Sequence, residues 1–338
     1  MSLRDVLAEA TRTLSDAGVP APRADALILA GHVLRVDRSE AERRALLGSS
    51  LEPAEREEFE TLVAERARRV PLQHLTGRAP FRHLELAVGP GVFVPRPETE
   101  LLVDLVLAQA PATVVDLCTG SGAIALAVAQ EAPAARVLAV ELSPEALAWA
   151  RHNIDATGLP VELVAADAAA DPGQVPALEG LVGSADVVVS NPPYIPTEMV
   201  PVDPEVADHD PQIALYGGSS DGLAIPLAVA SSAARLLRPG GLLVMEHAET
   251  QGQSLPAALR RTGEWAEVED VDDLTGRPRA VLARRIYSSP LVGRTRPLRS
   301  TPTPSFLADP FALASPRPRG AQDPPRKVTI RLRTFVSG

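Results

Sequence analysis

The stretch "SNPPY", residues 190–194, combines residue types that can hold a planar amino group. Asn191 carries a side-chain carbonyl that accepts hydrogen bonds, and Pro192, with its fixed φ and no N–H, helps hold nearby carbonyls in one direction. Two such acceptors match the two N–H donors of an NH₂ group, and Tyr194 adds an aromatic face for a flat group. The pattern favours chemistry at an amino or amide nitrogen over a loop that Pro192 and Pro193 merely stiffen.

The stretch "VVDLCTGSGAIALA", residues 114–127, predicts a strand, a small-residue loop and a helix. Gly120 and Gly122 let the backbone approach a ligand without Cβ clashes, and the following helix offers unpaired N–H groups. NAD-binding folds use Gly-x-Gly-x-x-Gly here, but Ala125 fills the third glycine position. Asp116 also suits the cationic amino end of S-adenosylmethionine better than a pyrophosphate. The spacing therefore favours S-adenosylmethionine over NAD, with an ordinary strand-to-helix turn as the remaining alternative.

Acidic residues follow the next two predicted strands. Glu141 in "VLAVELSP" lies about twenty residues beyond the loop, where a carboxylate can accept both ribose hydroxyls of a nucleoside. Glu141 could instead be a capping neighbour of Ser143. Asp167 in "VAADAAA" could accept an adenine amino hydrogen or simply occupy a turn. After the glycine loop, we expect both carboxylates to bind the cofactor.

These residues require a scaffold of alternating strands and helices. The predicted strands are 114–117, 137–141, 161–166 and 186–190, a fifth in "RPGGLLVMEH", and two near 265–270 and 279–285, with helices at 123–130 and 144–155. Short apolar strands separated by helices predict an α/β fold with a Rossmann-like, mostly parallel seven-stranded sheet that is covered on both faces. In such sheets ligands bind beyond the carboxyl ends of the strands, where every motif above lies.

Residues 1–76 predict a small helical domain for substrate recognition. Ser2 with Asp5, and Ser39 with Glu42, mark expected helix starts, and Pro53 suits the first turn of another helix. The first helix places Leu3, Val6, Leu7, Ala10 and Leu14 on one face.

Residues 77–97 predict a connecting β-hairpin between this domain and the predicted α/β domain at 98–285. Leu84, Leu86 and Val88 alternate, "GPG" turns the chain, and residues 92–94 are expected to return as the second strand.

Composition narrows the function classes. A formal charge of −10 over 338 residues argues against stable nucleic-acid binding, which usually needs a basic face. No apolar run approaches the roughly 20 residues of a membrane span, and the start lacks the features of a signal peptide, so we expect a cytoplasmic protein without a membrane partner. Cys118 is the single cysteine, which rules out an internal disulfide and a cysteine-rich metal site, and we expect no metal. The proline- and arginine-rich residues 286–338 predict a disordered, dispensable tail.

The motifs together resemble a known family. "NPPY" with "DLCTGSGAIAL" upstream is similar to amino-methyltransferases that use S-adenosylmethionine. In their order, "PLQHLTG", "VFVPRPETELLV", "SNPPYIP", "ALYGGSSDGL" and "GGLLVMEH" resemble the peptide chain release factor N5-glutamine methyltransferases, the HemK or PrmC family, over about residues 1–285. The resemblance implies methyl transfer from S-adenosylmethionine, leaving S-adenosylhomocysteine, to the glutamine in the Gly-Gly-Gln loop of class 1 release factors. We expect a monomer.

The resemblance also implies residue roles. The cofactor is expected to contact Cys118, Thr119, Gly120, Ser121, Gly122, Glu141, Asp167, Ala168 and Asn191, while Asn191, Pro192, Pro193 and Tyr194 hold the acceptor glutamine. Cys118 stands where the family usually has glycine, so its side chain is expected to point away from the methionine moiety. Arg96 and Glu98 are expected to line the cofactor pocket or to pair with each other.

Two alternatives remain open. An adenine amino-methyltransferase would present the same two N–H donors on a flipped base, which Tyr194 could stack against. A noncatalytic protein that binds S-adenosylmethionine would need the glycine loop but not "NPPY".

Overall fold

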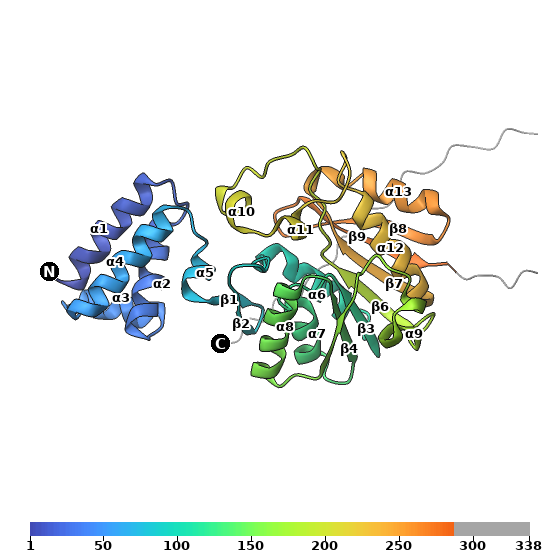
Figure 1. Cartoon of the computed structure of the whole chain (residues 1–338), viewed down its shortest axis with the longest axis horizontal. Helices are drawn as coiled ribbons and strands as arrows, with labels where there is room; N and C mark the ends of the chain where they lie inside the picture. Colours follow the sequence, from blue (N-terminus) through green and yellow to red (C-terminus); the bar gives the residue numbers. More distant parts are fainter. Residues whose placement is uncertain (287–338) are drawn as a thin grey trace, which may run out of the picture. The chain divides into compact units, whose positions relative to one another are not determined.

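The computed structural model describes residues 1–286. The predicted disorder and dispensability of the tail therefore concern residues outside the described part of the chain. The chain begins with five helices, continues through a short hairpin, and then builds a large sheet with helices on both faces (Figure 1). The first five helices are α1 (Leu3–Asp16), α2 (Pro22–Leu34), α3 (Arg38–Leu46), α4 (Pro53–Ala67) and α5 (Leu72–Thr76).

The helical region has its own apolar core, and its helix starts follow local chemistry. Ser2 and Asp5 form the expected capping box of α1, and the five apolar residues predicted on one face of that helix are buried. The prediction for α3 was wrong in detail, because its N-cap is Asp37, whose carboxylate accepts from Glu40 N at 2.8 Å. Both Asp37 and Ser39 have a glutamate three residues later, so the acid patterns are alike. Asp37 comes first in the chain and caps the helix, so α3 begins at Arg38.

The hairpin lies earlier in the chain than expected. It pairs β1 (Arg78–Phe81) with β2 (Leu84–Ala87) through a two-residue turn at Arg82 and His83. The expected strand at 92–94 is therefore wrong. "GPG" does form a turn, in which Val92 N donates to the Gly89 carbonyl at 3.4 Å, but no paired strand follows it. The turn lies against α8, where Trp149 Nε1 donates to the Pro90 carbonyl at 3.2 Å and a Cβ on Gly89 would meet the Trp149 ring at 2.6 Å.

The central sheet has seven strands in the order β5-β4-β3-β6-β7-β9-β8. Its strands are β3 (Thr113–Leu117), β4 (Arg136–Glu141), β5 (Val161–Ala165), β6 (Ala185–Ser190), β7 (Leu237–Glu246), β8 (Trp265–Asp272) and β9 (Pro278–Arg285). Strands β3 to β7 are mutually parallel, and β9 and β8 extend the sheet in antiparallel fashion. The predicted Rossmann-like architecture is confirmed. The chain reverses its direction of winding between β3 and β6, so this point is the expected ligand crevice.

Successive residues of a strand point to opposite faces of the sheet, and each face packs into its own apolar layer. Val114 and Val187 face α6 (Glu100–Leu107) and α7 (Ala123–Glu131), while Val115 and Val188 face the other side. That other layer contains α12 (Ala224–Leu236) and α13 (Ser254–Thr262) (Figure 1). The remaining elements are α8 (Pro144–Thr157), α9 (Pro176–Glu179), α10 (Pro204–His209), α11 (Gln212–Leu215) and the 3-10 turns η1 (Pro97–Thr99), η2 (Pro172–Gln174) and η3 (Glu249–Gln251).

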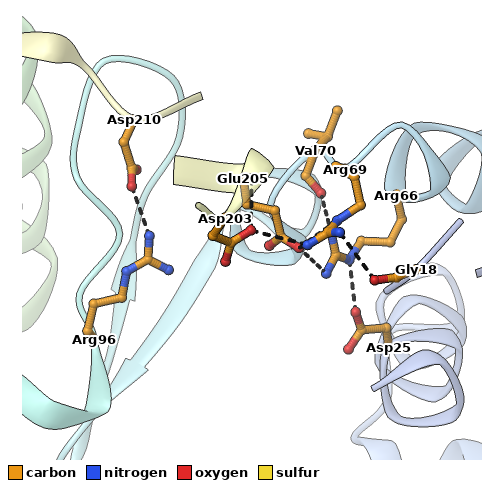
Figure 2. Close-up of polar contacts among 9 residues, drawn as sticks. All are labelled: Gly18, Asp25, Arg66, Arg69, Val70, Arg96, Asp203, Glu205 and Asp210. Carbon is orange, nitrogen blue, oxygen red and sulfur yellow. Dashed lines mark hydrogen bonds and ion pairs between the residues drawn. The ribbon is translucent and has the colours of Figure 1, made fainter. Parts of the chain in front are cut away.

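A charged cluster joins α4 to α10, as Figure 2 shows. The Arg66 side chain is 4% exposed and donates to Asp25 Oδ2 at 2.8 Å and to Glu205 Oε1 at 2.7 Å. Arg69 also donates to Glu205 Oε1, at 2.9 Å, and to Asp203 Oδ1 at 3.2 Å. Arg66 and Asp25 are buried and charged, so each depends on its partners for the hydrogen bonds that water no longer supplies, whereas Asp203 at the edge of the cluster is 50% exposed.

Removal of Arg66 should therefore destabilise the protein strongly. Arg66→Ala leaves Asp25 and Glu205 without this cationic partner, and we expect a loss of about 3–5 kcal/mol in the free energy of unfolding. Arg43→Ala is the control, because Arg43 pairs with Glu40 while 62% exposed, and such a pair contributes about 0–1 kcal/mol. Urea titrations of both variants measure the difference. Equal losses would mean that the buried cluster contributes no more than a surface pair.

Candidate active site

A cavity of about 470 Å³ lies beyond the carboxyl ends of β3 to β6. It brings together most residues that the sequence marked. Its walls include Cys118, Thr119, Gly120, Ser121, Glu141, Asp167, Ala168, Asn191, Pro193 and Tyr194. Gly122 and Pro192 are buried next to these residues but do not line the cavity. The cavity thus lies where the sheet reverses its winding, as the fold requires.

Asp116, near the end of β3, forms hydrogen bonds with the glycine loop and the first turn of α7 that follows it. This carboxylate is fully buried and accepts from Thr119 Oγ1 at 2.5 Å and from Ala125 N at 3.2 Å. Burial raises its pKa to about 7, against these two hydrogen bonds. Asp116 does not line the cavity, so the expectation that it meets the amino end of the cofactor finds no support in its position. Both hydrogen bonds end on Asp116 Oδ2, and Oδ1 has no hydrogen-bond partner among the described residues.

Three residues of the loop have positive φ angles. Gly120 and Gly122 have φ of 60° and 86°, and Cys118 has φ of 64°. Glycine adopts this region freely, whereas a residue with Cβ loses roughly 1–2 kcal/mol there. Cys118 packs against the apolar core while it also lines the cavity, and burial raises the pKa of its thiol. A Cβ on Gly120 would meet nothing within 4 Å, so the loop borders open space at that residue.

Glu141, the last residue of β4, and Asp167, which follows β5, both line the cavity. Glu141 accepts three backbone hydrogen bonds, from Gly120 N at 2.9 Å, Leu142 N at 2.8 Å and Ser143 N at 2.9 Å. It therefore ties the glycine loop to the end of β4, which sequence reasoning did not anticipate. Asp167 is exposed and accepts from Ala169 N at 2.8 Å, in the turn that was one of its two expected roles.

Asn191 and Tyr194 belong to one hydrogen-bonded chain. Asn191 Nδ2 donates to Thr99 Oγ1 at 3.3 Å, and Thr99 Oγ1 donates to Glu246 Oε2 at 2.7 Å. Tyr194 OH reaches the other oxygen of Glu246 at 3.2 Å. Burial raises the pKa of Tyr194, so its hydroxyl keeps its proton. Asn191 and Tyr194, which the sequence predicted at the acceptor glutamine, are thus held by Thr99 and Glu246, which the sequence did not predict as site residues.

Arg96 was expected either to line the cavity or to pair with Glu98. It lines the cavity, and it does not pair with Glu98. It donates to Asp210 Oδ2 at 2.8 Å (Figure 2) and lies over the Phe93 ring at 5.0 Å from the centroid. Burial raises the pKa of Asp210 to about 6, and the Arg96 guanidinium opposes that rise. Glu98 is exposed and does not line the cavity.

Thr99, Glu246 and Asn153 are the polar residues that sequence reasoning missed. Asn153, in α8, donates through Nδ2 to the Ser121 carbonyl at 2.9 Å and to the Ala87 carbonyl at 3.0 Å, and its Oδ1 accepts from Ala87 N at 2.8 Å. Thr99 lies within "RPETE" and Glu246 within "VMEH", and the sequence analysis gave neither residue a role. A polar residue at the end of an apolar strand was the available signal for Glu246.

Two further observations concern the described residues alone. Within 1–286 no group of three or more His, Cys, Asp or Glu side chains is arranged to hold a metal ion. None of the helices described there is long and apolar enough to cross a bilayer.

Comparison with protein families gives two matches along the chain. Residues 5–77 match the PrmC N-terminal domain, which spans the five helices. Residues 84–203 match the methyltransferase small domain, which contains the glycine loop, Glu141, Asp167 and "NPPY".

Similar whole proteins carry a specific name. The release factor glutamine methyltransferase of Mycolicibacterium smegmatis is 51% identical over 290 residues, which are 85% of this chain and 99% of that protein. The protein of the same name from Streptomyces coelicolor is 48% identical over 82% of this chain and 96% of that one. Among solved structures, a methyltransferase from Pyrococcus furiosus aligns over 61% of this chain and 91% of that chain, with 19% identity and a TM-score of 0.45.

The contacts of Glu141 predict its effect on cofactor binding. Glu141→Ala removes the carboxylate expected to accept the ribose hydroxyls and the bond that ties Gly120 to β4, so S-adenosylmethionine affinity should fall by roughly 2–4 kcal/mol. Glu162→Ala is the control, because Glu162 in β5 is exposed and pairs with Arg136 outside the cavity. Calorimetric titration with S-adenosylmethionine measures both. Unchanged binding by Glu141→Ala would remove Glu141 from the cofactor site.

Proposed function

This chain belongs to the release factor glutamine methyltransferase family, and we propose that its cavity methylates the side-chain amide nitrogen of the glutamine in the Gly-Gly-Gln loop of class 1 release factors. We propose S-adenosylmethionine as the methyl donor, bound at the glycine loop. The observation that carries the assignment is the position of Asn191. Its side chain follows β6 directly, in the same cavity as the loop that follows β3.

The residues of the cavity fit a nucleoside cofactor. Gly120 borders open space, so a ligand can approach its backbone, and Glu141 and Asp167 present carboxylates along the same wall. Ala168 is buried and small beside them, which leaves room for a flat base. When bound, S-adenosylmethionine supplies an electrophilic methyl group, and S-adenosylhomocysteine is the product.

The protein's part in the reaction is to position the acceptor nitrogen. An amide nitrogen is a poor nucleophile because its lone pair is delocalised into the carbonyl. Asn191 Oδ1 and the Pro192 carbonyl accept its two hydrogens, which raises electron density on nitrogen and fixes the direction in which it faces. Tyr194 covers the amide plane and excludes water. Oriented acceptors of this kind require no additional general base.

We also propose where the protein works, its oligomeric state and the role of its helical region. Release factors act in translation, so we propose that the protein works in the cytoplasm, as a monomer. We expect the helical region at 1–76 to contact the release factor outside the Gly-Gly-Gln loop, because the cavity itself has room for little more than the cofactor and one side chain.

The acceptor role of Asn191 predicts a large loss on truncation. Asn191→Ala leaves one N–H of the glutamine without an acceptor in a dry site, so methylation should slow by about 30- to 1,000-fold, or roughly 2–4 kcal/mol. Asn191→Asp keeps an acceptor, but its charge favours the cationic cofactor over the transition state, in which the positive charge disperses. Turnover should fall while cofactor affinity is largely kept. Gln253→Ala, which truncates an exposed amide, is the control.

Mass spectrometry of a class 1 release factor gives the readout. The wild-type protein should add one methyl group to the side-chain nitrogen of the Gly-Gly-Gln glutamine. Full activity of Asn191→Ala would refute the proposed acceptor pair. With labelled S-adenosylmethionine and both DNA and a release factor present, label on adenine and none on glutamine would refute the proposed substrate.

A further inference from the structure

Four side chains beside the cavity form a continuous hydrogen-bonded chain, in the order Asn191, Thr99, Glu246, Tyr194. They come from the loop after β6, from η1, and from the end of β7. Thr99 is 4% exposed and Glu246 is 2% exposed, so water does not compete for their hydrogen bonds. The proposed function uses Asn191 and Tyr194 but gives no role to the two residues between them.

The chemistry of the four groups determines which of them donate. An ionised carboxylate only accepts, and a hydroxyl has a single hydrogen. When Glu246 is ionised, the hydroxyls of Thr99 and Tyr194 therefore both donate to it, one to each oxygen. Thr99 Oγ1 then has only lone pairs left for a second partner.

This order dictates how the Asn191 amide is turned. A lone pair on Thr99 Oγ1 can be met by the NH₂ group of Asn191 but not by its carbonyl oxygen, and Nδ2 is the atom 3.3 Å away. The two ends of an asparagine amide have nearly the same shape, so such a network decides between them. With Nδ2 held by Thr99, Oδ1 remains available to an acceptor amide.

We propose that Thr99 and Glu246 are positioning residues that keep Asn191 Oδ1, rather than Nδ2, turned toward the glutamine to be methylated. This inference rests on the proposed function. In the reversed orientation an NH₂ group would face the NH₂ group of the glutamine, two donors would meet, and one hydrogen of the substrate would have no acceptor. Thr99 and Glu246 thus act through Asn191; Thr99 lines the cavity, whereas Glu246 lies behind it.

The protonation state of Glu246 controls the arrangement. A protonated Glu246 must donate to one hydroxyl, and if that is Thr99, the Thr99 hydrogen becomes available to Asn191 Oδ1 and the amide can reverse. Burial raises the pKa of Glu246, and the Glu98 carboxylate raises it further. Thr99, Arg279 of β9 and Tyr194 oppose the rise. Activity should therefore fall on the acid side as Glu246 takes up a proton.

A pair of variants at Thr99 tests the orientation. Thr99→Val has nearly the same shape but no hydroxyl, and kcat for release factor methylation should fall about 10- to 100-fold while S-adenosylmethionine affinity stays within about threefold. Thr99→Ser keeps the hydroxyl and should retain kcat within about threefold. Wild-type kcat in Thr99→Val, or equal losses in both variants, would overturn the proposal.

Cofactor binding also reports whether each variant is folded. If Thr99→Val no longer binds S-adenosylmethionine, Thr99→Ala replaces it, because the smaller side chain cannot clash, and the same comparison with Thr99→Ser decides. A wild-type protein that does not methylate glutamine would refute the proposed function instead, so the two failures are distinguishable.

Glu246→Gln supplies a readout that a merely structural role would not change. A glutamine carries an NH₂ group that must donate, like the protonated acid, so kcat should be low at every pH and the acid-side fall should disappear. The pKa values of Asp116 and Asp210 are also raised, and these residues remain in the variant. An acid-side fall that persists unchanged in Glu246→Gln would assign it to another group and overturn the role of Glu246.

Discussion

Parallel strands bring their carboxyl ends to one edge of the sheet, and every functional arrangement in this protein depends on that constraint. The loop after β3, Glu141 at the end of β4, the turn after β5, Asn191 after β6 and Glu246 at the end of β7 all lie along this edge. Residues that are far apart in the chain therefore become neighbours without any long-range pairing of their own. Reversal of the winding between β3 and β6 opens the edge into a cavity.

Buried charges then order the groups along this edge. Asp116 holds the glycine loop through Thr119 and Ala125, and Glu246 holds the acceptor loop through Thr99 and Tyr194. Both oxygens of Glu246 are met by hydroxyl donors, whereas Asp116 accepts through Oδ2 alone and its Oδ1 has no hydrogen-bond partner among the described residues. Rigid loops over the sheet thus follow from the need to satisfy a few buried acids, and two chemically distinct halves of one cavity are built by the same means.

The sequence predicted the sheet well because short apolar runs between helical stretches leave few alternatives. It failed where a local pattern fits more than one structure. Alternation continued from Leu84 to Val94, but only 84–87 forms a strand, since "GPG" packs on Trp149, which no local pattern reveals. Asp116 was expected at the cofactor because an acid follows an apolar strand, yet its side chain bonds the loop beneath. Thr99 and Glu246 are 147 residues apart, so their contact could not be inferred from spacing.

The central claim is that Asn191 Oδ1 and the Pro192 carbonyl together hold the NH₂ group of the substrate glutamine. A crystal structure of the protein with S-adenosylhomocysteine and a class 1 release factor measures this most directly. The account predicts that the glutamine side-chain nitrogen lies within about 3.2 Å of both oxygens, with Asn191 Nδ2 still on Thr99. A glutamine nitrogen that reaches neither oxygen, or an Asn191 amide reversed toward it, would contradict the account.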